Sequence, residues 1–292
     1  MHISFWNVLR DPYTGEDLAF EGVVEDERWI EGVLKSRSGA SYRVIDGVAV
    51  FVREGVDTGW SDEDIEELKR GNWIRRNWED HMSKIGKGGL WDRFCREIAE
   101  HGGLILDVAS GPGGGFVPCV LYYNDGAYVA MNDIEYRILL MWRRFLKSVG
   151  KGRNVSFIAA DARRLPLRDC SLDVVTSAGG FGNIDRNDVA LREAFRVLKP
   201  GGAVYMAEGG ILREDFEKLP AEVQRKWLER SPALLGEWDR ILRSVGFKIV
   251  LYQRVGVGTI SPDESELGRE AYRYGVTLRY VGYYIKALKP FE

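Results

Sequence analysis

The chain has 292 residues, of which 45% are hydrophobic and 29% are charged, and its formal net charge at pH 7 is −3. This composition is that of an ordinary globular protein and excludes a disordered chain. A net negative charge offers no overall basic field, so no DNA partner is expected, although RNA stays open as a partner. No apolar run reaches the length of a membrane span and the first residues do not resemble a signal peptide, so we expect a cytoplasmic protein without a membrane partner.

The three cysteines, Cys95, Cys119 and Cys170, are widely separated in the sequence. An odd number of scattered cysteines, without the short spacing of zinc-binding motifs, indicates no metal site. In a cytoplasmic protein such residues are ordinarily reduced and often lie in the core. We therefore expect three reduced core cysteines and no bound metal.

Residues 1–53 are predicted to form a small β module. Asp46 and Gly47 lie between two short apolar runs, which is a strong signal for a β-hairpin. The module resembles the zinc ribbon that precedes some methyltransferase domains, including those of certain rRNA guanine methyltransferases. The positions that carry the resemblance are Leu9, Pro12, Gly15, Gly39, Tyr42, Ile45, Asp46 and Gly47.

The resemblance assigns the four zinc-ligand positions of the ribbon to Asp11, Thr14, Lys35 and Ser38. Lysine and serine are not ligands in ordinary structural zinc sites, which need four good ligands. The module is therefore expected to be a ribbon without its metal, held by its own apolar contacts or by docking on the main domain. The alternative is an unrelated small sheet that matches the ribbon by chance.

Residues 54–101 are predicted to be a helical linker or lid. Ser61 followed by Glu63 and Asp64 is typical of a helix N-cap with favourable charge in the first turn. Trp78 and His81 in this segment are candidates for facing a functional site. The alternative is that the tryptophans pack on the edge of the sheet and that His81 is solvated.

A short apolar run at residues 104–106 ends in Asp107 and is followed by a loop of small residues. The run predicts a buried parallel strand, and the glycines of the loop allow the backbone to approach a ligand closely. A dinucleotide would require Gly-x-Gly-x-x-Gly, but Phe116 stands where the third glycine would be. An acid before a small-residue loop fits S-adenosylmethionine better, and a helix is expected from about Gly113 to Tyr123.

Two further predicted strands end in acids, at Asp133 and at Asp161. Asp133 lies about 20 residues past the glycines, where an acid binds the ribose hydroxyls of a nucleotide cofactor. NAD sites use the same device, so Asp133 does not discriminate between the two cofactors. A fourth strand at residues 174–178 and a fifth at 204–207 follow, the fifth after the turn Lys199-Pro-Gly-Gly202.

The end of the chain is predicted to contain a charged helical segment at residues 213–228, a helix at 237–245 and a strand at 246–251. Residues 254–274 are expected to be irregular. The chain closes with residues 276–278 and 280–288, which are expected to form the hairpin of the sixth and seventh strands.

From about residue 100 to 289 the chain resembles a class I S-adenosylmethionine-dependent methyltransferase of the type with Leu-Lys-Pro-Gly-Gly. The resemblance implies a Rossmann-like α/β domain over residues 102–292, whose seven-stranded sheet has an antiparallel last strand. It implies S-adenosylmethionine as the cofactor, although Ala109 replaces a common loop glycine. The implied cofactor-binding residues are Asp107, Ala109, Ser110, Gly111, Gly113, Asp133, Ile134, Asp161, Ala162, Ser177 and Ala178.

The resemblance implies methyl transfer but assigns no catalytic residue, because a base is needed only when the acceptor is protonated. Candidates for acceptor contacts are His81, Asn183 and Glu208. The acceptor itself is unidentified, and a small molecule or a protein is favoured slightly over RNA. The alternatives are a methyltransferase-like module that binds a partner without chemistry and an NAD-linked oxidoreductase.

Overall fold

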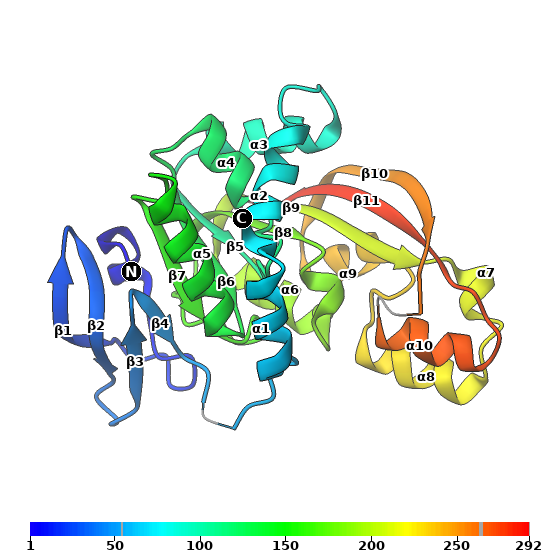
Figure 1. Ribbon diagram of the computed structural model, residues 1–292, viewed down its shortest axis with the longest axis horizontal. Helices are drawn as coiled ribbons and strands as arrows, with labels where there is room; N and C mark the ends of the chain where they lie inside the picture. Colours follow the sequence, from blue (N-terminus) through cyan, green and yellow to red (C-terminus); the bar gives the residue numbers. More distant parts are fainter. Residues whose placement is uncertain (54, 263–264, 292) are drawn as a thin grey trace.

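The computed structural model describes residues 1–53, 55–262 and 265–291, and in these residues the strands form one mixed sheet (Figure 1). Its strand order is β1-β2-β3-β4-β7-β6-β5-β8-β9-β11-β10. The strands are β1 (Ala19–Glu25), β2 (Arg28–Lys35), β3 (Ser41–Ile45), β4 (Val48–Val50), β5 (Leu104–Asp107), β6 (Tyr128–Asp133), β7 (Val155–Ala159), β8 (Leu172–Ala178), β9 (Leu198–Ile211), β10 (Lys248–Thr259) and β11 (Arg279–Leu288).

The seven strands from β7 to β10 in this order form the Rossmann-like part of the sheet. Strands β5 to β9 pair in parallel, whereas β11 is antiparallel to both β9 and β10. This confirms the expected seven-stranded α/β fold with an antiparallel last strand. The chain moves outward from β5 to β6 and β7 on one side and resumes at β8 on the other, so β5 and β8 flank the switch point where such sheets bind ligands.

The N-terminal β module extends this sheet at its β7 edge. Strands β1 to β4 are antiparallel to one another, and β4 pairs in parallel with β7, with Val48 opposite Phe157. The stacked rings of Trp6, Phe20 and Trp29 pack the outer part of the module. The module is therefore held by apolar contacts and by backbone pairing with the main sheet.

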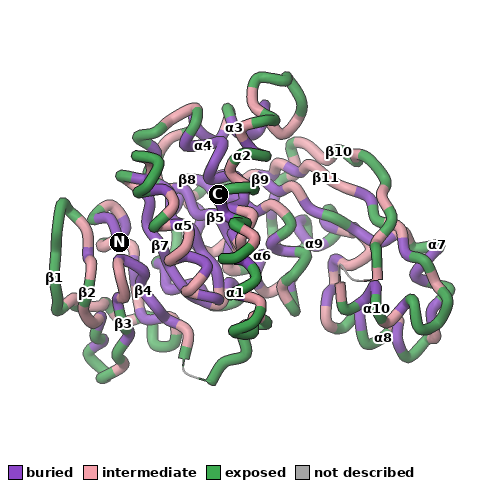
Figure 2. Tube along the Cα trace, in the orientation of Figure 1, coloured by how far each residue is buried: buried purple, intermediate pink, exposed green. Residues whose placement is uncertain are grey.

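Helices cover both faces of the central strands, whose buried backbone runs through the middle of the molecule in Figure 2. Helices α1 to α5 contribute to one core, around Phe94 and Trp142, and α6 and α9 contribute to a second core, around Leu191 and Trp238. The helices are α1 (Asp62–Arg70), α2 (Trp73–Lys84), α3 (Leu90–His101), α4 (Val117–Tyr123), α5 (Tyr136–Ser148), α6 (Asn187–Val197), α7 (Arg213–Phe216), α8 (Ala221–Arg230), α9 (Trp238–Val245) and α10 (Glu266–Arg273), with short 3₁₀ helices η1 (Ile3–Val8) and η2 (Phe181–Asn183).

A lobe formed by α7, α8 and α10 lies at one end of the sheet, on the right in Figure 1. It has a small core of its own, which includes Phe216, Trp227 and Leu267. Buried Asp215 anchors the lobe to β11, because its carboxylate accepts a hydrogen bond from Nε of Arg279 at 2.7 Å. We call this part of the molecule the C-terminal lobe.

Several predicted boundaries differ from the structure. The helix after the glycine loop begins only at Val117, because the residues before it form turns. The fifth strand, β9, already includes the Lys199-Pro-Gly-Gly202 segment. The expectation of an irregular segment at 254–274 was wrong for its described residues, since β10 continues to Thr259 and α10 follows. The sixth strand of the closing hairpin is β10, which pairs with β11.

The prediction of three reduced core cysteines was wrong in part, because Cys95 and Cys119 lie in the core as expected but are not reduced. Cys95 on α3 and Cys119 on α4 form a disulfide, while Cys170 is free and exposed. Sequence spacing did not indicate this pair, because the two residues meet only when α3 packs against α4. The disulfide therefore joins the last helix before β5 to the first helix after it.

The four ligand positions of the ribbon resemblance have other partners in this structure. Asp11 accepts hydrogen bonds from the backbone N–H groups of Tyr13 and Thr14, and from the hydroxyl of Tyr42 at 3.0 Å. Lys35 pairs with a glutamate, and the hydroxyl of Ser38 lies 3.0 Å from that of Ser36. The relationship of the module to zinc ribbons stays a prediction. None of the described helices is both long enough and apolar enough to cross a membrane.

Candidate functional site

Strand β5 ends at Asp107, whose carboxylate is fully buried beneath the glycine loop. It accepts hydrogen bonds from the hydroxyl of Ser110 at 2.7 Å, the backbone N–H of Phe116 at 3.1 Å and the hydroxyl of Thr176 at 2.6 Å. Burial raises the pKa of Asp107 to about 6, although these hydrogen bonds oppose the shift. Asp107 therefore holds the inner side of the glycine loop through its hydrogen bonds with Ser110 and Phe116.

The outer side of the loop is held by the next strand end. The carboxylate of Asp133 accepts hydrogen bonds from the backbone N–H of Gly111 at 2.8 Å and of Glu135 at 2.9 Å. Indole Nε1 of Trp142 donates to the carbonyl oxygen of Gly111 at 2.8 Å. Burial raises the pKa of Asp133, and its two oxygens still have lone pairs for a ligand.

Two side chains of helix α2 form hydrogen bonds with backbone oxygens of the glycine loop. The amide of Asn77 donates to the carbonyl oxygen of Pro112 at 2.9 Å, and Nε2 of His81 donates to that of Gly113 at 2.8 Å. His81 is buried, stacks on Trp91 and has no partner for its Nδ1 within the described part of the chain. Burial lowers its pKa, so His81 is a neutral structural contact of the loop and is not solvated.

A cavity of about 380 Å³ opens at the carboxyl ends of β5, β6 and β7, at the switch point of the sheet. We call it the cofactor cavity. Its walls include six of the residues that the sequence predicted to bind the cofactor, namely Ala109, Gly111, Asp133, Ile134, Asp161 and Ala162. The topology therefore brings together three separate strand ends that the sequence could only place in order.

The other five predicted residues lie in or beside the same loops but not in the wall of this cavity. Asp107, Ser110 and Ser177 are buried, and the hydroxyl of Ser177 accepts the backbone N–H of Phe181 at 3.1 Å. The backbone oxygen of Gly113 is bound to His81. Ala178 is half-buried at the end of β8. Their contacts with a cofactor remain predictions.

Asp161 at the end of β7 has an arginine partner. Both carboxylate oxygens of Asp161 accept hydrogen bonds from Arg163, at 2.8 to 3.1 Å. The pKa of Asp161 is lowered overall, because this arginine outweighs the opposing effect of burial. A ligand that reaches Asp161 has to share its carboxylate with Arg163, which also lines the cavity.

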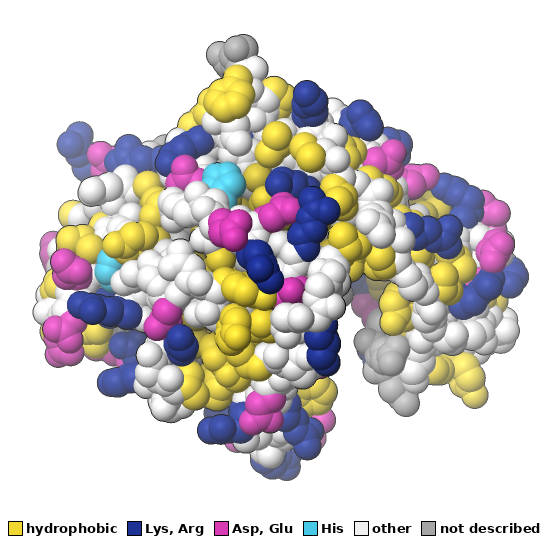
Figure 3. Space-filling model, turned by 90° about the horizontal axis from the view of Figure 1, so that it is seen from above, with side chains coloured by type: hydrophobic (Ala, Val, Ile, Leu, Met, Phe, Trp, Pro, Cys, Tyr) yellow, Lys and Arg dark blue, Asp and Glu magenta, His cyan; other side chains and the backbone are white. Residues whose placement is uncertain are grey.

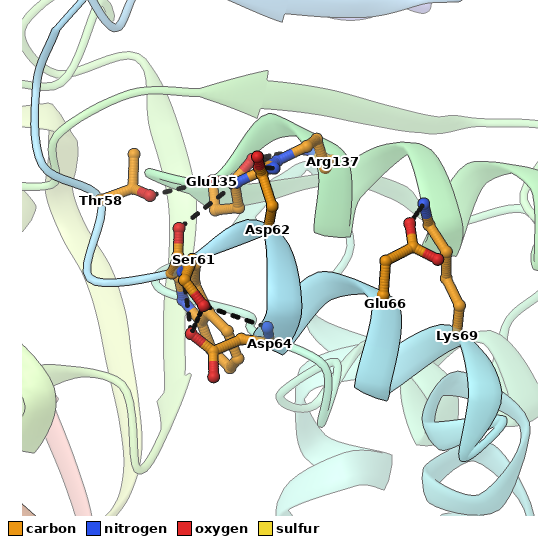
Figure 4. A network of polar contacts seen from close by, with 9 residues as sticks. Thr58, Ser61, Asp62, Asp64, Glu66, Lys69, Glu135 and Arg137 are labelled. Atoms are coloured by element: carbon orange, nitrogen blue, oxygen red, sulfur yellow. Dashed lines mark hydrogen bonds and ion pairs between the residues drawn. The ribbon is translucent and has the colours of Figure 1, made fainter.

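The front wall of the cofactor cavity comes from residues before α1, which the sequence analysis did not single out. Asp57, Thr58 and Trp60 line the cavity. Figure 4 shows how this segment is held: the hydroxyl of Thr58 donates to Glu135 at 2.9 Å, and Arg137 bridges Glu135 and Asp62. The segment is thereby attached to the start of α5, directly beside Asp133.

A second cavity of about 400 Å³ lies between the end of β9 and the C-terminal lobe. We call it the lobe cavity. The surface is hollowed between the main body and this lobe when the molecule is viewed from above (Figure 3). Apolar side chains form much of its wall, among them Ile211, Trp227, Leu234, Trp238 and Ile260.

Glu208 is a buried carboxylate in the wall of the lobe cavity. It accepts hydrogen bonds from the backbone N–H groups of Phe181 at 3.2 Å and Gly182 at 3.0 Å, at the start of η2. Burial raises the pKa of Glu208 to about 7, and these two hydrogen bonds, together with one from the side chain of Ser177, oppose the shift only in part. Glu208 therefore exchanges its proton near neutral pH.

The two cavities meet at three residues, Asn183, Asp185 and Arg230, which line both of them. Arg230 forms ion pairs with Asp185 at 2.5 Å and with Glu266 at 2.6 Å, so it ties the loop after β8 to α10. Of the three predicted acceptor contacts, Asn183 and Glu208 thus lie at the cavities and His81 does not. Arg230 was missed because its sequence context is that of a solvated helix face.

The strand order and the cavity at the switch point define the fold of class I S-adenosylmethionine-dependent methyltransferases. Residues 77–218 match the model of the ubiE/COQ5 methyltransferase family. This stretch contains the glycine loop, Asp133, Asp161 and Glu208. The class that the sequence predicted is therefore supported, and the cofactor of this class is S-adenosylmethionine.

Curated relatives match a similar length of the chain. One is the ubiquinone/menaquinone biosynthesis C-methyltransferase UbiE of Azotobacter vinelandii, 37% identical over 134 residues, which cover 44% of this chain and 53% of the relative. The counterpart from Pseudomonas aeruginosa is also 37% identical and is 52% covered. The chain thus spans about half the length of the curated relatives it matches.

Solved structures share the fold at low identity. A phosphoethanolamine N-methyltransferase from Haemonchus contortus, in complex with S-adenosylhomocysteine, has a TM-score of 0.53 at 15% identity and covers 98% of this chain and 72% of its own. The [4+2]-cyclase SpnF has a TM-score of 0.50 at 18% identity, with coverage of 78% and 97%. The fold thus also occurs in a protein that is named for a different reaction.

Proposed function

We propose that the chain transfers a methyl group from S-adenosylmethionine to a carbon atom of a small molecule with a quinone-type ring. The observation that carries the proposal is the cofactor cavity, in which Asp133 joins the glycine loop to the second strand end within a segment that matches the ubiE/COQ5 family. The quinone-type acceptor is supported by the names of the relatives, which are C-methyltransferases of ubiquinone and menaquinone biosynthesis.

The residues of the cofactor cavity fit S-adenosylmethionine. Asp133 has free lone pairs for the ribose hydroxyls, and Asp161 with Ala162 lies where the adenine is expected. A Cβ at Gly111 would have nothing closer than 3.9 Å, so the loop leaves room beside its backbone. The predicted residues Asp107, Ser110, Gly113, Ser177 and Ala178 would support these contacts from behind the cavity wall.

When bound, the cofactor supplies a methyl group activated by its sulfonium. The chain's own contribution is to orient the acceptor and to exclude water, which accounts for several kcal/mol of a barrier without any acid or base. The segment before α1 and the loop after β8 both line the cavity and suit this role.

Dinucleotide binding has less support than this proposal. An antiparallel β11 within the order β9-β11-β10 differs from the parallel dinucleotide-binding sheet. Phe116 is buried where the third glycine of the dinucleotide motif would stand. Its backbone N–H is bound to Asp107 and is therefore not free to bind a phosphate.

The test is calorimetric titration of S-adenosylhomocysteine into the full chain, with Asp133→Ala alongside. Wild-type binding in the micromolar range, weakened at least tenfold by the substitution, would support the proposal. The matched control is Asp125→Ala, a surface aspartate paired with Lys151, which is expected to bind as the wild type does. Wild-type binding without turnover on any acceptor would favour the partner-binding module, and no binding would refute the proposed cofactor.

We further propose three functional parts: a metal-free ribbon at residues 1–53, a lid at 54–101 and the methyltransferase domain at 102–292. A lid role for the second part is supported by the contacts of Asn77 and His81 with the glycine loop. A cytoplasmic location remains part of the proposal, although the Cys95–Cys119 disulfide is of a kind that is rare in that compartment. Separation of cells into cytoplasm, membrane and exported fractions tests it.

A further inference from the structure

We infer that the lobe cavity binds the methyl acceptor and that the carboxylate of Glu208 takes the proton of an acidic hydroxyl on the acceptor's aromatic ring. This inference rests on the proposed function, because it names the acceptor site and the base of that same reaction. It is carried by the position of the lobe cavity, by the chemistry of its walls and by the surroundings of Glu208.

The lobe cavity has the position that an acceptor site requires. It adjoins the cofactor cavity at Asn183, Asp185 and Arg230, which line both cavities. Gly179 and Gly182 line the lobe cavity, whereas Gly180 lines the cofactor cavity. Molecules that occupy both cavities would therefore meet beside the shared residues Asn183, Asp185 and Arg230, and the neighbouring glycines add no side chain between them.

The walls of the lobe cavity suit a flat apolar ring. The indole N–H groups of Trp227 and Trp238 are bound to Glu270 at 2.6 Å and to the backbone oxygen of Gly209 at 2.9 Å. Both indoles therefore face the cavity without an unsatisfied donor of their own. Aromatic and aliphatic walls with one buried polar group are typical of sites for small aromatic ligands.

Glu208 differs from the other acid side chains of this cavity. Asp185 and Glu266 both pair with Arg230, so their charges are compensated. Within the described residues no lysine, arginine or histidine pairs with Glu208, whose hydrogen-bond partners are the backbone N–H groups of Phe181 and Gly182 and the side chain of Ser177. These three donors leave at least one lone pair of the carboxylate free. A buried carboxylate without a cation is well suited to accept a proton.

The titratable groups around Glu208 leave its pKa near neutral pH. Asp107 beneath it disfavours the charged form, and Tyr283 lies opposite it on β11. Tyr280 is the remaining titratable side chain of the cavity wall. Burial is the largest effect and raises the pKa of Glu208 to about 7. This value matches the range that a general base needs.

In a hydroquinone acceptor, the hydroxyl proton passes to a carboxylate oxygen of Glu208, and the electron density of the resulting ring oxyanion forms the new carbon–carbon bond to the methyl group. The methyl–sulfur bond breaks, and its electron pair stays on sulfur. The hydrogen on the methylated ring carbon then moves to the ring oxygen, which restores the hydroxyl, and Glu208 releases its proton to water.

The decisive experiment compares the pH profiles of wild type and Glu208→Gln with a short-chain 2-prenyl-1,4-naphthoquinol as the probe, under nitrogen. At pH 7 the variant is expected to lose about 10² to 10⁴-fold in kcat, the usual contribution of a general base. The deficit should shrink about tenfold per pH unit up to pH 9.5, because the quinol increasingly ionises by itself. A deficit that stays constant with pH would mean that Glu208 only holds the η2 turn, and would overturn the assignment.

The proposed acceptor site is tested by a substitution that fills the lobe cavity with a larger side chain. Leu234→Trp, within the lobe cavity, is expected to weaken binding of the oxidised quinone, followed by calorimetry, at least tenfold. The matched control is Leu228→Trp on the exposed face of α8, which should bind as the wild type does. Unchanged quinone binding by Leu234→Trp would refute the acceptor site.

Titration with S-adenosylhomocysteine distinguishes a failure of the proposed function from a failure of the acceptor-site assignment. Glu208→Gln and Leu234→Trp are expected to bind S-adenosylhomocysteine within threefold of the wild type, since neither residue lines the cofactor cavity. If the wild type itself binds no S-adenosylhomocysteine, the proposed function fails first. If the wild type binds it and methylates the quinol while both variants behave as the wild type, only this inference fails.

Discussion

The carboxylate of Asp133 accepts a hydrogen bond from the backbone N–H of Gly111 at 2.8 Å. The end of β6 therefore sets the position of the glycine loop that follows β5. Asp107 holds the same loop from the inside through Ser110 and Phe116. Two acids from neighbouring strands thus determine the loop conformation before any ligand arrives, which reduces the ordering cost of binding.

Because Asp107 packs against the inner side of the glycine loop, alanine substitutions at Gly115 and Gly113 should differ in their effect on stability. A Cβ at Gly115, where φ is +52°, would lie 2.0 Å from Oδ2 of Asp107, whereas a Cβ at Gly113 would meet nothing within 4 Å. Gly115→Ala is expected to lower the free energy of unfolding by about 3 kcal/mol, through overpacking and left-handed strain. Gly113→Ala should change it by less than about 0.5 kcal/mol. Urea unfolding of both variants measures this, and equal stabilities would contradict the loop geometry.

The disulfide between α3 and α4 should contribute to stability. Cys95 and Cys119 are 24 residues apart, and closing a loop of this size stabilises a protein by about 3 kcal/mol. Cys95→Ala/Cys119→Ala is therefore expected to melt at a lower temperature than the wild type in scanning calorimetry. Cys170→Ser, which changes an exposed free cysteine, is the control and should melt with the wild type.

A thiol count checks the same bond directly. In urea without reductant the wild type is expected to expose one reactive thiol, that of Cys170, and three after reduction. Three reactive thiols before reduction would show that the bridge is absent.

The network in Figure 4 is expected to control affinity for the cofactor more than global stability. Arg137→Ala removes the bridge between Glu135 and Asp62, and so loosens the front wall of the cofactor cavity. We expect a three- to tenfold weaker affinity for S-adenosylhomocysteine, about 0.7 to 1.4 kcal/mol. Arg144→Ala, an exposed arginine of the same helix, is the control. Equal affinity of the two variants would show that the front wall does not contribute to binding.

Burial of Glu208 should give stability a defined dependence on pH. Its pKa is raised to about 7 in the folded chain from an ordinary value of 4.5, so the folded state binds the extra proton. The stabilisation from this proton is complete below pH 4.5 and is lost as the pH rises through 7. Relative to the wild type, Glu208→Gln should therefore gain stability between pH 5 and pH 8.

The control for that measurement is Glu97→Gln. The pKa of Glu97 is lowered in the folded chain, mainly by Lys286 and Arg93 against the opposing effect of burial. The contribution of Glu97 to the free energy of unfolding is therefore constant above pH 5. The stability difference between Glu97→Gln and the wild type should not change with pH between 5 and 8. Thermal melts across this range follow both variants, and a flat difference for Glu208→Gln would contradict its raised pKa.

Much of the sheet could be predicted because local patterns specify buried parallel strands. The apolar runs before Asp107, Asp133 and Asp161 form β5, β6 and β7 in the expected order, with Asp161 just after the end of β7. Parallel strands place their carboxyl ends at one edge, so the three acids had to lie near one another. Boundaries were less accurate where Pro-Gly-Gly in β9 and polar residues in β10 follow no simple alternation.

The sequence by itself thus determined the class of fold, the glycine loop and the side of the sheet on which a nucleotide-like cofactor binds, because these depend on neighbours along the chain. Only the tertiary structure decided that Cys95 meets Cys119, that the segment at Thr58 closes the cofactor cavity and that Glu208 lies in a second cavity without a cation. These contacts join residues far apart in the chain. They form only when helices and lobe pack on the finished sheet, and no local pattern encodes such packing.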